Sequence, residues 1–385
     1  MDNKLPTRRS FLLGLAAVPI ASHGSFGAAQ QELMFAGTNT GGKSSSKGIY
    51  AYRWDRTTGT LSPLGQAETA SPAYMAVGHS RRYLYAANEI SNYMGAKTGS
   101  VSAFSLDRAT GNLTLKNVVS SGGAGPCCIE IDHTEKCVFV ADGAGGSLAS
   151  YRALPAGGLS DPVSNIHFTG HSVNPKRQMA PWTHCTTVSP DNRYLLVNDL
   201  GLDRITTYRF DPSTALLTPN AAPPYEAVPG AGPRSFTFHP NGRWAYSANE
   251  MGNTIDTLVW DSERGTLTRT QNISTVPAEF TGQNATATVR VDAAGRFLYA
   301  SNRGANTIAV FAINATDGSL RLMQQISCGG KTPRYFALDP SNRWLLVANQ
   351  DSAGIVVLAR DPGTGRLTST SSQYALDFPM FLIFA

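Results

Sequence analysis

Charged residues are scarce in this chain: Asp, Glu, Lys and Arg make up 15% of its 385 residues and leave a net charge of only +5. So weak a basic excess argues against a phosphate-binding groove, and we expect no nucleic-acid partner. A hydrophobic content of 42% excludes an intrinsically disordered chain. The 37 glycines and 22 prolines favour many short strands joined by tight turns over a large helical core.

Cysteine is also sparse, and its spacing matches no set of metal ligands. The five residues are Cys127, Cys128, Cys137, Cys185 and Cys328. Because the number is odd, at least one thiol stays free. We therefore expect no structural disulfide framework, no metal and no other cofactor.

Long hydrophobic runs are missing as well. The apolar run 13–20 is about half the length of a membrane span. It follows Thr7-Arg8-Arg9-Ser10-Phe11-Leu12 and precedes Gly27-Ala28-Ala29, the order of a twin-arginine export signal. The alternative is a terminal strand or helix that happens to carry two arginines. We predict that residues 1–29 are a cleaved signal peptide, that the twin-arginine export machinery is a partner, and that the mature protein is periplasmic or secreted without a membrane anchor.

A first motif, Asp-x-x-Thr-Gly-x-Leu, recurs about every 50 residues, which is the length of a propeller blade. An Asp or Asn can close an Asx turn, and the Gly tolerates positive φ, so each copy predicts a hairpin between two strands. The copies, the last of them degenerate, are Asp55–Leu61, Asp107–Leu113, Asp211–Leu217, Asp261–Leu267, Asn314–Leu320, Asp361–Leu367 and Ala153–Leu159.

A second motif has a Pro, a strand, a polar turn, another strand, and then Asn or Asp. Its six copies are Pro72–Asn88, Pro126–Asp142, Pro181–Asn198, Pro233–Asn249, Pro333–Asn349 and a copy ending at Asn302 in which Thr286 replaces Pro. A seventh unit is split between the chain ends, 33–38 and 378–384. The sequence therefore predicts an all-β chain, with residues 30–385 forming one seven-bladed β-propeller of four-stranded blades, closed by pairing of the N- and C-terminal strands.

The second motif also predicts where polar side chains gather. Within each hairpin, the residue after the Pro and the residue after the Asn meet at one end. Arg234 and Glu250 are equidistant from Gly242 at the turn, so we expect them nearly opposite, with Cβ atoms about 5 Å apart. An ordinary, weakly stabilising ion pair is the alternative interpretation of this pair.

The same reasoning places other residues on this face of the channel. They are His184 near Asp199, Arg334 near Gln350, and Glu89 and Arg303. The resulting ring of cations with few acids suits an anionic substrate and a developing oxyanion. His184, which Trp182 and Cys185 flank, could instead be a structural histidine. The long irregular stretch 154–179, which contains Arg177, is typical of a binding loop.

Several segments together resemble the seven-bladed β-propeller lactonase family, which includes bacterial 6-phosphogluconolactonases and fungal carboxy-muconate lactonizing enzymes. The resemblance covers nearly all of the chain after residue 29. The matching segments are Gly37–Thr40, Ser172–Gln178, Asn198–Ile205, Gly232–Phe236, Ser247–Glu250, Gly295–Gly304 and Val347–Gln350.

The resemblance implies that His184, Arg234, Glu250 and Arg303 are the catalytic residues. By charge, Arg177 and Arg334 would hold the carboxylate or phosphate of the substrate, with Asp199 and Gln350 beside them. The chain departs from the family pattern at two places that bear on substrate and turnover. Trp182 and Cys128 stand where His is frequent, and Thr288 stands where Glu is frequent.

We therefore expect a lactonase that hydrolyses a sugar lactone or another small anionic lactone, with Glu250 or His184 as general base. Two alternatives remain open. One is a muconate-type cycloisomerase, in which a base moves a proton and no water enters. The other is a non-catalytic propeller that binds a partner on its face.

Overall fold

The computed structural model describes Met1 and residues 31–352 and 354–385. The predicted export signal, residues 1–29, lies outside this range apart from Met1. In the described part of the chain, no helix is long and apolar enough to cross a membrane.

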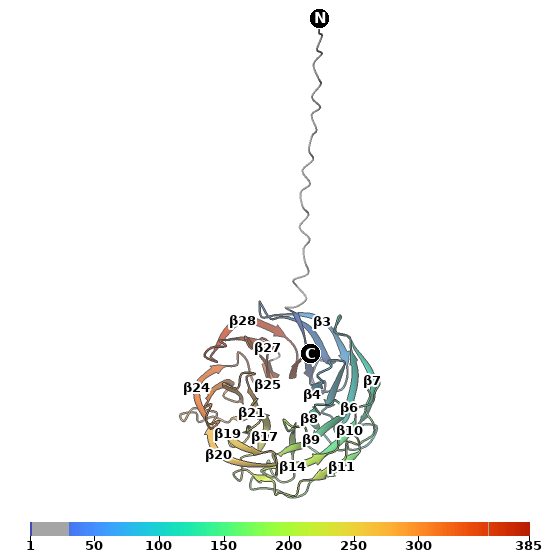
Figure 1. Ribbon diagram of the computed structural model, residues 1–385, viewed down its shortest axis with the longest axis vertical. Coiled ribbons are helices and arrows are strands. Elements are labelled where there is room, and N and C mark those ends of the chain that lie inside the picture. The colour runs from blue at the N-terminus through green and yellow to red at the C-terminus, as the bar shows by residue number, and fades with distance from the viewer. Residues whose placement is uncertain (2–30, 353) are drawn as a thin grey trace.

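Seven antiparallel sheets are arranged radially around a central channel (Figure 1). In each of blades two to seven, the strands run outward from the channel in chain order. The second and third blades contain β4 (Pro72–Val77), β5 (Tyr83–Asn88), β6 (Ser100–Leu106), β7 (Leu113–Ser120), β8 (Pro126–Ile131), β9 (Cys137–Asp142), β10 (Ser147–Arg152) and β11 (Ser164–His167). The fourth and fifth contain β12 (Thr183–Val188), β13 (Tyr194–Asp199), β14 (Arg204–Phe210), β15 (Leu217–Pro219), β16 (Tyr225–Glu226), β17 (Pro233–Phe238), β18 (Trp244–Asn249), β19 (Thr254–Asp261) and β20 (Thr266–Ser274).

The sixth and seventh blades contain β21 (Ala285–Val291), β22 (Phe297–Arg303), β23 (Thr307–Ile313), β24 (Leu320–Ser327), β25 (Pro333–Leu338), β26 (Trp344–Asn349), β27 (Gly354–Arg360) and β28 (Leu367–Ala375). A short 3-10 turn, η2 (Gln350–Ser352), follows β26. The first blade combines β29 (Pro379–Phe384) with β1 (Gln31–Thr38), β2 (Gly48–Asp55) and β3 (Thr60–Glu68). The predicted propeller and its closure are thus confirmed: β29 is the inner strand, and it pairs antiparallel with β1.

One blade differs from the predicted four strands. In the fourth blade, β14 pairs with two short segments, β15 and β16, so this sheet has five strands. The two segments together occupy the outer edge that a single strand fills in the other blades.

The turns of the first motif form as predicted. In the first copy, Asp55 Oδ1 accepts the Thr57 amide at 2.8 Å, and Gly59 has φ 70°. In the fourth blade Ala215 takes the left-handed conformation, with φ 65°.

Tyrosine hydroxyls form hydrogen bonds from one blade to these turns in the next blade. The hydroxyl of Tyr246 donates to the Gly318 carbonyl at 2.9 Å, and that of Tyr299 donates to the Gly365 carbonyl at 2.8 Å. Each tyrosine lies on the second strand of one blade and reaches the turn of the next. Blades therefore bind side by side through specific hydrogen bonds as well as apolar packing.

Burial decreases from the middle of each blade to the rim. Every residue of β18 is buried, whereas most of β3 is exposed. The second strands read as continuous apolar runs because neighbouring blades cover both of their faces. This packing holds the inner strands rigidly around the channel, and those strands carry the candidate site.

Candidate active site

A β-bulge occurs at the start of the inner strands. In the fifth blade, Pro233 pairs with Asn249 and Ser235 with Ala248, so Arg234 between them has no partner in the ladder. A bulge re-aims its extra side chain. Equivalent bulge residues from six blades line one cavity in the channel: Ala73, Cys127, His184, Arg234, Arg334 and Met380. From the sixth blade, Thr288 lines the same cavity, within the irregular pairing between Thr286 and Val289.

Because of these bulges, the predicted pairing of residues between the first and second strands of a blade is wrong. Arg234 was expected opposite Glu250, and His184 opposite Asp199, but the ladder partner of Asp199 is Thr183. The extra residue shifts the pairing by one to two positions. The side chains of Arg234 and Glu250 nevertheless meet, with Arg234 Nε 2.9 Å from Glu250 Oε2.

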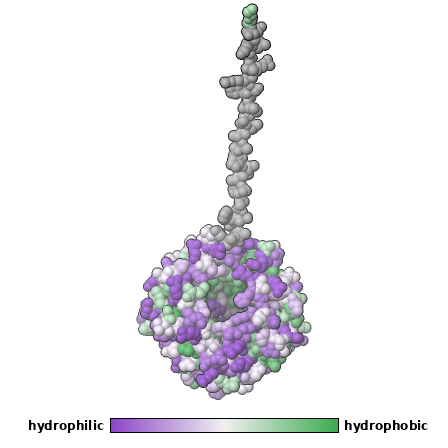
Figure 2. All heavy atoms as spheres, viewed as in Figure 1, coloured by the Kyte–Doolittle hydropathy of each residue, from purple (hydrophilic) through white to green (hydrophobic). Residues whose placement is uncertain are grey.

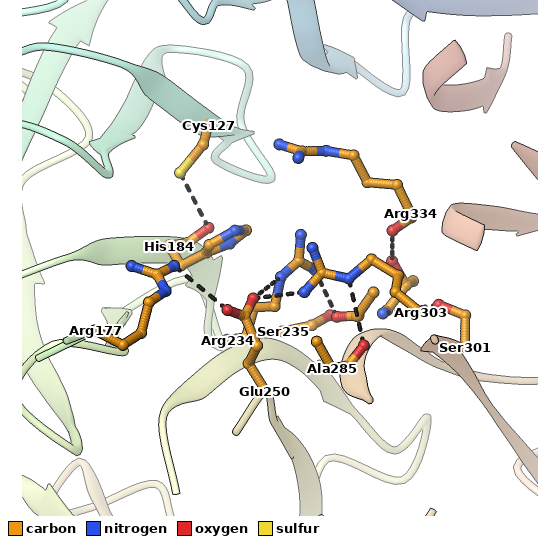
Figure 3. A network of polar contacts seen from close by, with 12 residues as sticks. Cys127, Arg177, His184, Arg234, Ser235, Glu250, Ala285, Ser301, Arg303 and Arg334 are labelled. Atoms are coloured by element: carbon orange, nitrogen blue, oxygen red, sulfur yellow. Dashed lines mark hydrogen bonds and ion pairs between the residues drawn. The ribbon is translucent and has the colours of Figure 1, made fainter. Parts of the chain in front are cut away.

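Glu250 is the centre of an arginine cluster (Figure 3). Besides Arg234, Arg303 Nη2 lies 2.6 Å from Glu250 Oε2, and Arg177 Nη2 lies 3.4 Å from Oε1. Burial opposes ionisation of Glu250, but the charges of Arg303, Arg234 and Arg177 outweigh it and lower its pKa to about 2. Glu250 is therefore an ionised anchor for the arginines and a weak base.

Arg234 has the most buried side chain of the site's arginines, 5% exposed. Its Nη1 donates to the Ala287 carbonyl at 2.6 Å. Burial, and then the charge of Arg303, lower its pKa to about 9 despite the opposing effect of Glu250. Arg234 thus remains protonated at neutral pH.

A fourth arginine enters from another blade. Arg334 Nη2 lies 2.8 Å from Glu89 Oε2, which joins the seventh blade to the second across the channel. Thr288 in β21 holds the backbone of β25 next to Arg334, because its Oγ1 donates to the Arg334 carbonyl at 3.0 Å. Four arginines face two glutamates in the site, a difference of +2, so the site has an excess of positive charge that an anionic ligand would offset.

His184 faces this cluster with its ring free (Figure 3). Within the described residues, no group exchanges a hydrogen bond with its ring nitrogens; only its backbone carbonyl is used, by the Cys127 thiol. Burial, and then the charges of Arg234 and Arg334, lower the pKa of His184 well below 6.5. The imidazole is thus neutral at neutral pH. The adjoining cavity, about 20 Å³, has room for about one water molecule.

Arg177 is presented by a tightly hydrogen-bonded loop. Asn174 Oδ1 accepts the amides of Lys176 and Arg177, and the fully buried Gln178 donates to the Leu200 carbonyl at 2.9 Å. The Arg177 guanidinium lies 4.2 Å from the ring centroid of Trp182, a cation–π contact. Trp182, which replaces a frequent histidine of the family pattern, therefore steadies Arg177 beside Glu250.

Two predicted substrate-binding residues lie apart from the cluster. Asp199 is buried, and its Oδ1 accepts the amides of Trp182 at 2.8 Å and Leu202 at 3.0 Å. Burial raises its pKa to about 6. Gln350 lies in η2 and donates to Asp351. Asp199 therefore organises the turn that carries Trp182, and Gln350 occupies the rim.

Cys127 and Met380 line the cavity although the sequence analysis did not name them as site residues. A signal for both was present, since each directly follows the proline that begins its inner strand, as Arg234 and Arg334 do. Cys128, at the other departure from the family pattern, is buried. All five cysteines are free in the described structure, and no group of three His, Cys, Asp or Glu side chains there could hold a metal ion.

Comparisons with known proteins agree with this architecture. The family model of the seven-bladed β-propeller lactonases matches residues 33–384. The 6-phosphogluconolactonase of Bacillus subtilis is 31% identical over 351 residues, which cover 91% of this chain and 97% of the relative. The solved structure of the periplasmic gluconolactonase of Pseudomonas aeruginosa is 31% identical, with a TM-score of 0.85, covering 92% of this chain and 99% of that one. The chain therefore belongs to the seven-bladed β-propeller lactonase family.

Proposed function

We propose that this protein hydrolyses the ester bond of a sugar lactone or another small anionic lactone. The observation that carries the proposal is the free, neutral imidazole of His184 beside a cavity of water size, facing four arginines. The names of the Bacillus and Pseudomonas relatives support the substrate class.

His184 is the better of the two candidate bases. Glu250 is engaged by three arginines, and a carboxylate with a pKa of about 2 removes a proton from water poorly. The His184 ring has no competing hydrogen bond. An anionic substrate would also offset the arginine charges that lower the pKa of His184, bringing it closer to neutral pH when the substrate is bound.

The arginines would stabilise the negative charge that develops during the reaction. As water attacks the lactone carbonyl, the carbonyl oxygen becomes an oxyanion, which Arg234 and Arg303 would stabilise in a site largely closed to water. Arg334, which lines the cavity, and Arg177 would hold the carboxylate or phosphate of the substrate. Glu250 fixes the positions of Arg234 and Arg303 before the reaction.

A substrate panel tests the activity. The purified protein is incubated with gluconolactone, its 6-phosphate and a muconate-derived lactone, and ring opening is followed by the acid released above the spontaneous rate. We expect hydrolysis of at least one sugar lactone. Isomerisation without net hydrolysis would favour the cycloisomerase instead, and absence of any turnover would favour a binding propeller.

Loss of the Glu250 carboxylate should impair both folding stability and rate. We expect Glu250→Gln to lower the free energy of unfolding by about 3 kcal/mol, because it leaves buried arginines uncompensated. Hydrolysis should fall about 100-fold or more, because the oxyanion donors lose their anchor. Thermal melts and initial rates check this.

The partly exposed Arg81–Glu32 pair, 3.4 Å apart, provides the matched control, with side chains 41% and 17% exposed. Glu32→Gln should change the unfolding free energy by less than about 1 kcal/mol and leave hydrolysis intact. A folded Glu250→Gln protein that hydrolyses the best lactone within about threefold of the parent, roughly 0.65 kcal/mol in the barrier, would show that the cluster is structural.

We also propose that the protein is exported by the twin-arginine route to the periplasm or beyond. The periplasmic gluconolactonase of Pseudomonas supports this location. Changing Arg8 and Arg9 together to Lys should retain the precursor, with its first 29 residues attached, in the cytoplasm. Fractionation and the mass of the recovered protein measure this. Normal periplasmic recovery of processed double variant would contradict the export proposal.

A further inference from the structure

An aromatic plug divides the central channel into two compartments. Phe381 stacks between Tyr74 and Tyr335, with ring centroids 3.9 Å and 4.0 Å apart. Arg290 reaches the plug from the far side, because its Nη2 donates to the hydroxyl of Tyr74 at 2.9 Å and of Tyr335 at 2.7 Å. The cavity beside His184 lies on one side of this plug, and Arg290 lies on the other.

Beyond the plug the channel widens. Two hollows of about 350 and 300 Å³ share Tyr74, Glu130, His133 and Arg290 in their walls. Each is far larger than the cavity beside His184 and falls in the size range of small-molecule pockets, about 300–1,000 Å³. Figure 2 shows that the face in view is hollowed at its centre, where the channel opens.

Glu130 and Arg290 face these hollows without an ion pair, and His79, His133, His239 and Cys185 also line them. The described residues form no ion pair with Glu130 or with Arg290. Burial, and then the neighbouring Cys185, raise the pKa of Glu130 to about 8, and Arg290 and the Val188 backbone offset this only in part. Glu130 therefore lacks the cationic partner that would stabilise its ionised form.

Arg290 is held rigidly yet retains donors. Its contacts with Tyr74, Tyr335 and the Val289 carbonyl use three of the five guanidinium N–H groups. The described residues accept no hydrogen bond from the remaining N–H groups, which can therefore bind a carboxylate that enters the hollow. Because the guanidinium is already oriented, binding costs little side-chain entropy.

Aromatic rings form part of the wall of the hollow that Glu130 also lines. Phe236 and Phe238 line the larger hollow with a centroid separation of 5.2 Å. Aromatic faces attract ammonium groups, and a nearby carboxylate strengthens that preference.

We propose that this far compartment binds a small zwitterion, with its ammonium group at Glu130 and its carboxylate at Arg290. A molecule with both charges compensates both residues, whereas a simple cation would be repelled by Arg290 and a simple anion would leave Glu130 without a cationic partner. The plug keeps this ligand away from His184, so the site is separate from the proposed lactone site and does not depend on it.

Calorimetry on the full-length protein tests the proposal. The probes are glycine, β-alanine and 4-aminobutyrate, which differ in charge separation, with propylamine and propionate as single-charge controls. We expect at least one zwitterion to bind at least about tenfold more tightly than either control, since one charge-assisted contact contributes about that factor. No zwitterion binding at millimolar concentration, or equal binding of a control, would overturn the proposal.

Three variants locate the binding. Glu130→Gln should weaken zwitterion binding about tenfold or more, whereas Glu279→Gln, which removes the same charge at an exposed loop position, should not. Thr237→Phe, which fills the larger hollow without changing charge, should also weaken binding. Unchanged affinity in both Glu130→Gln and Thr237→Phe, with parental melting temperatures, would place the ligand elsewhere and reject the site.

Discussion

Replacement of His184 by Asn is expected to lower the rate constant of lactone hydrolysis by about 100-fold or more with little change in melting temperature. General-base catalysis commonly contributes about 10²–10⁴-fold. The ring has no hydrogen bond with the described residues, so its removal leaves no buried partner unsatisfied. Initial rates at saturating substrate and a thermal melt measure the two effects.

The pH dependence identifies the base independently. Protonation of His184 abolishes its base function, and its pKa lies well below 6.5 in the free protein. We therefore expect kcat/KM to stay level from pH 8 to below pH 6.5 and to fall only at lower pH. The Asn variant should lose this acidic limb. An unchanged limb in His184→Asn, or activity within threefold of the parent, would assign the base elsewhere.

Deletion of residues 378–385 is expected to prevent folding. This segment contains β29, the inner strand of the first blade, which pairs with β1 and also contacts β4 and β25 in the neighbouring blades. Its loss exposes the edge of β1 and removes Phe381 from the plug. Soluble yield and a thermal melt compare the truncated chain with the parent.

Phe381→Leu is the control for this deletion. It removes the ring from the plug but keeps the backbone ladder, so we expect a folded protein with a lowered melting temperature. A truncated chain that melts cooperatively at the temperature of the parent would disprove closure by the terminal strands.

Local sequence signals were enough to predict the architecture. Each turn such as Asp55–Leu61 is specified by residues next to one another, because an Asx side chain and a left-handed glycine act within one turn. The regular spacing of these turns then determined the number of blades. The split blade followed because the two chain ends each supplied one unmatched part of the repeat.

The site was predicted less completely from these signals. The resemblance named His184, Arg234, Glu250 and Arg303. The structure places His184 and Arg234 in the wall of one cavity and joins Arg234 and Arg303 through Glu250. Asp199, in contrast, turns into its own loop and binds backbone amides. Repeat spacing placed it at the correct end of the hairpin but could not show the direction of its side chain.

What the sequence by itself determined is therefore the propeller, its closure and the face on which polar residues gather, since these depend on local turns and periodicity. The tertiary structure alone decided the bulges that aim His184 and Arg234 into the channel, and the contact between Arg334 and Glu89, residues 245 positions apart. The physical reason is that a side chain's direction and charge state depend on neighbouring blades, and no repeat in one blade specifies which partners the others bring.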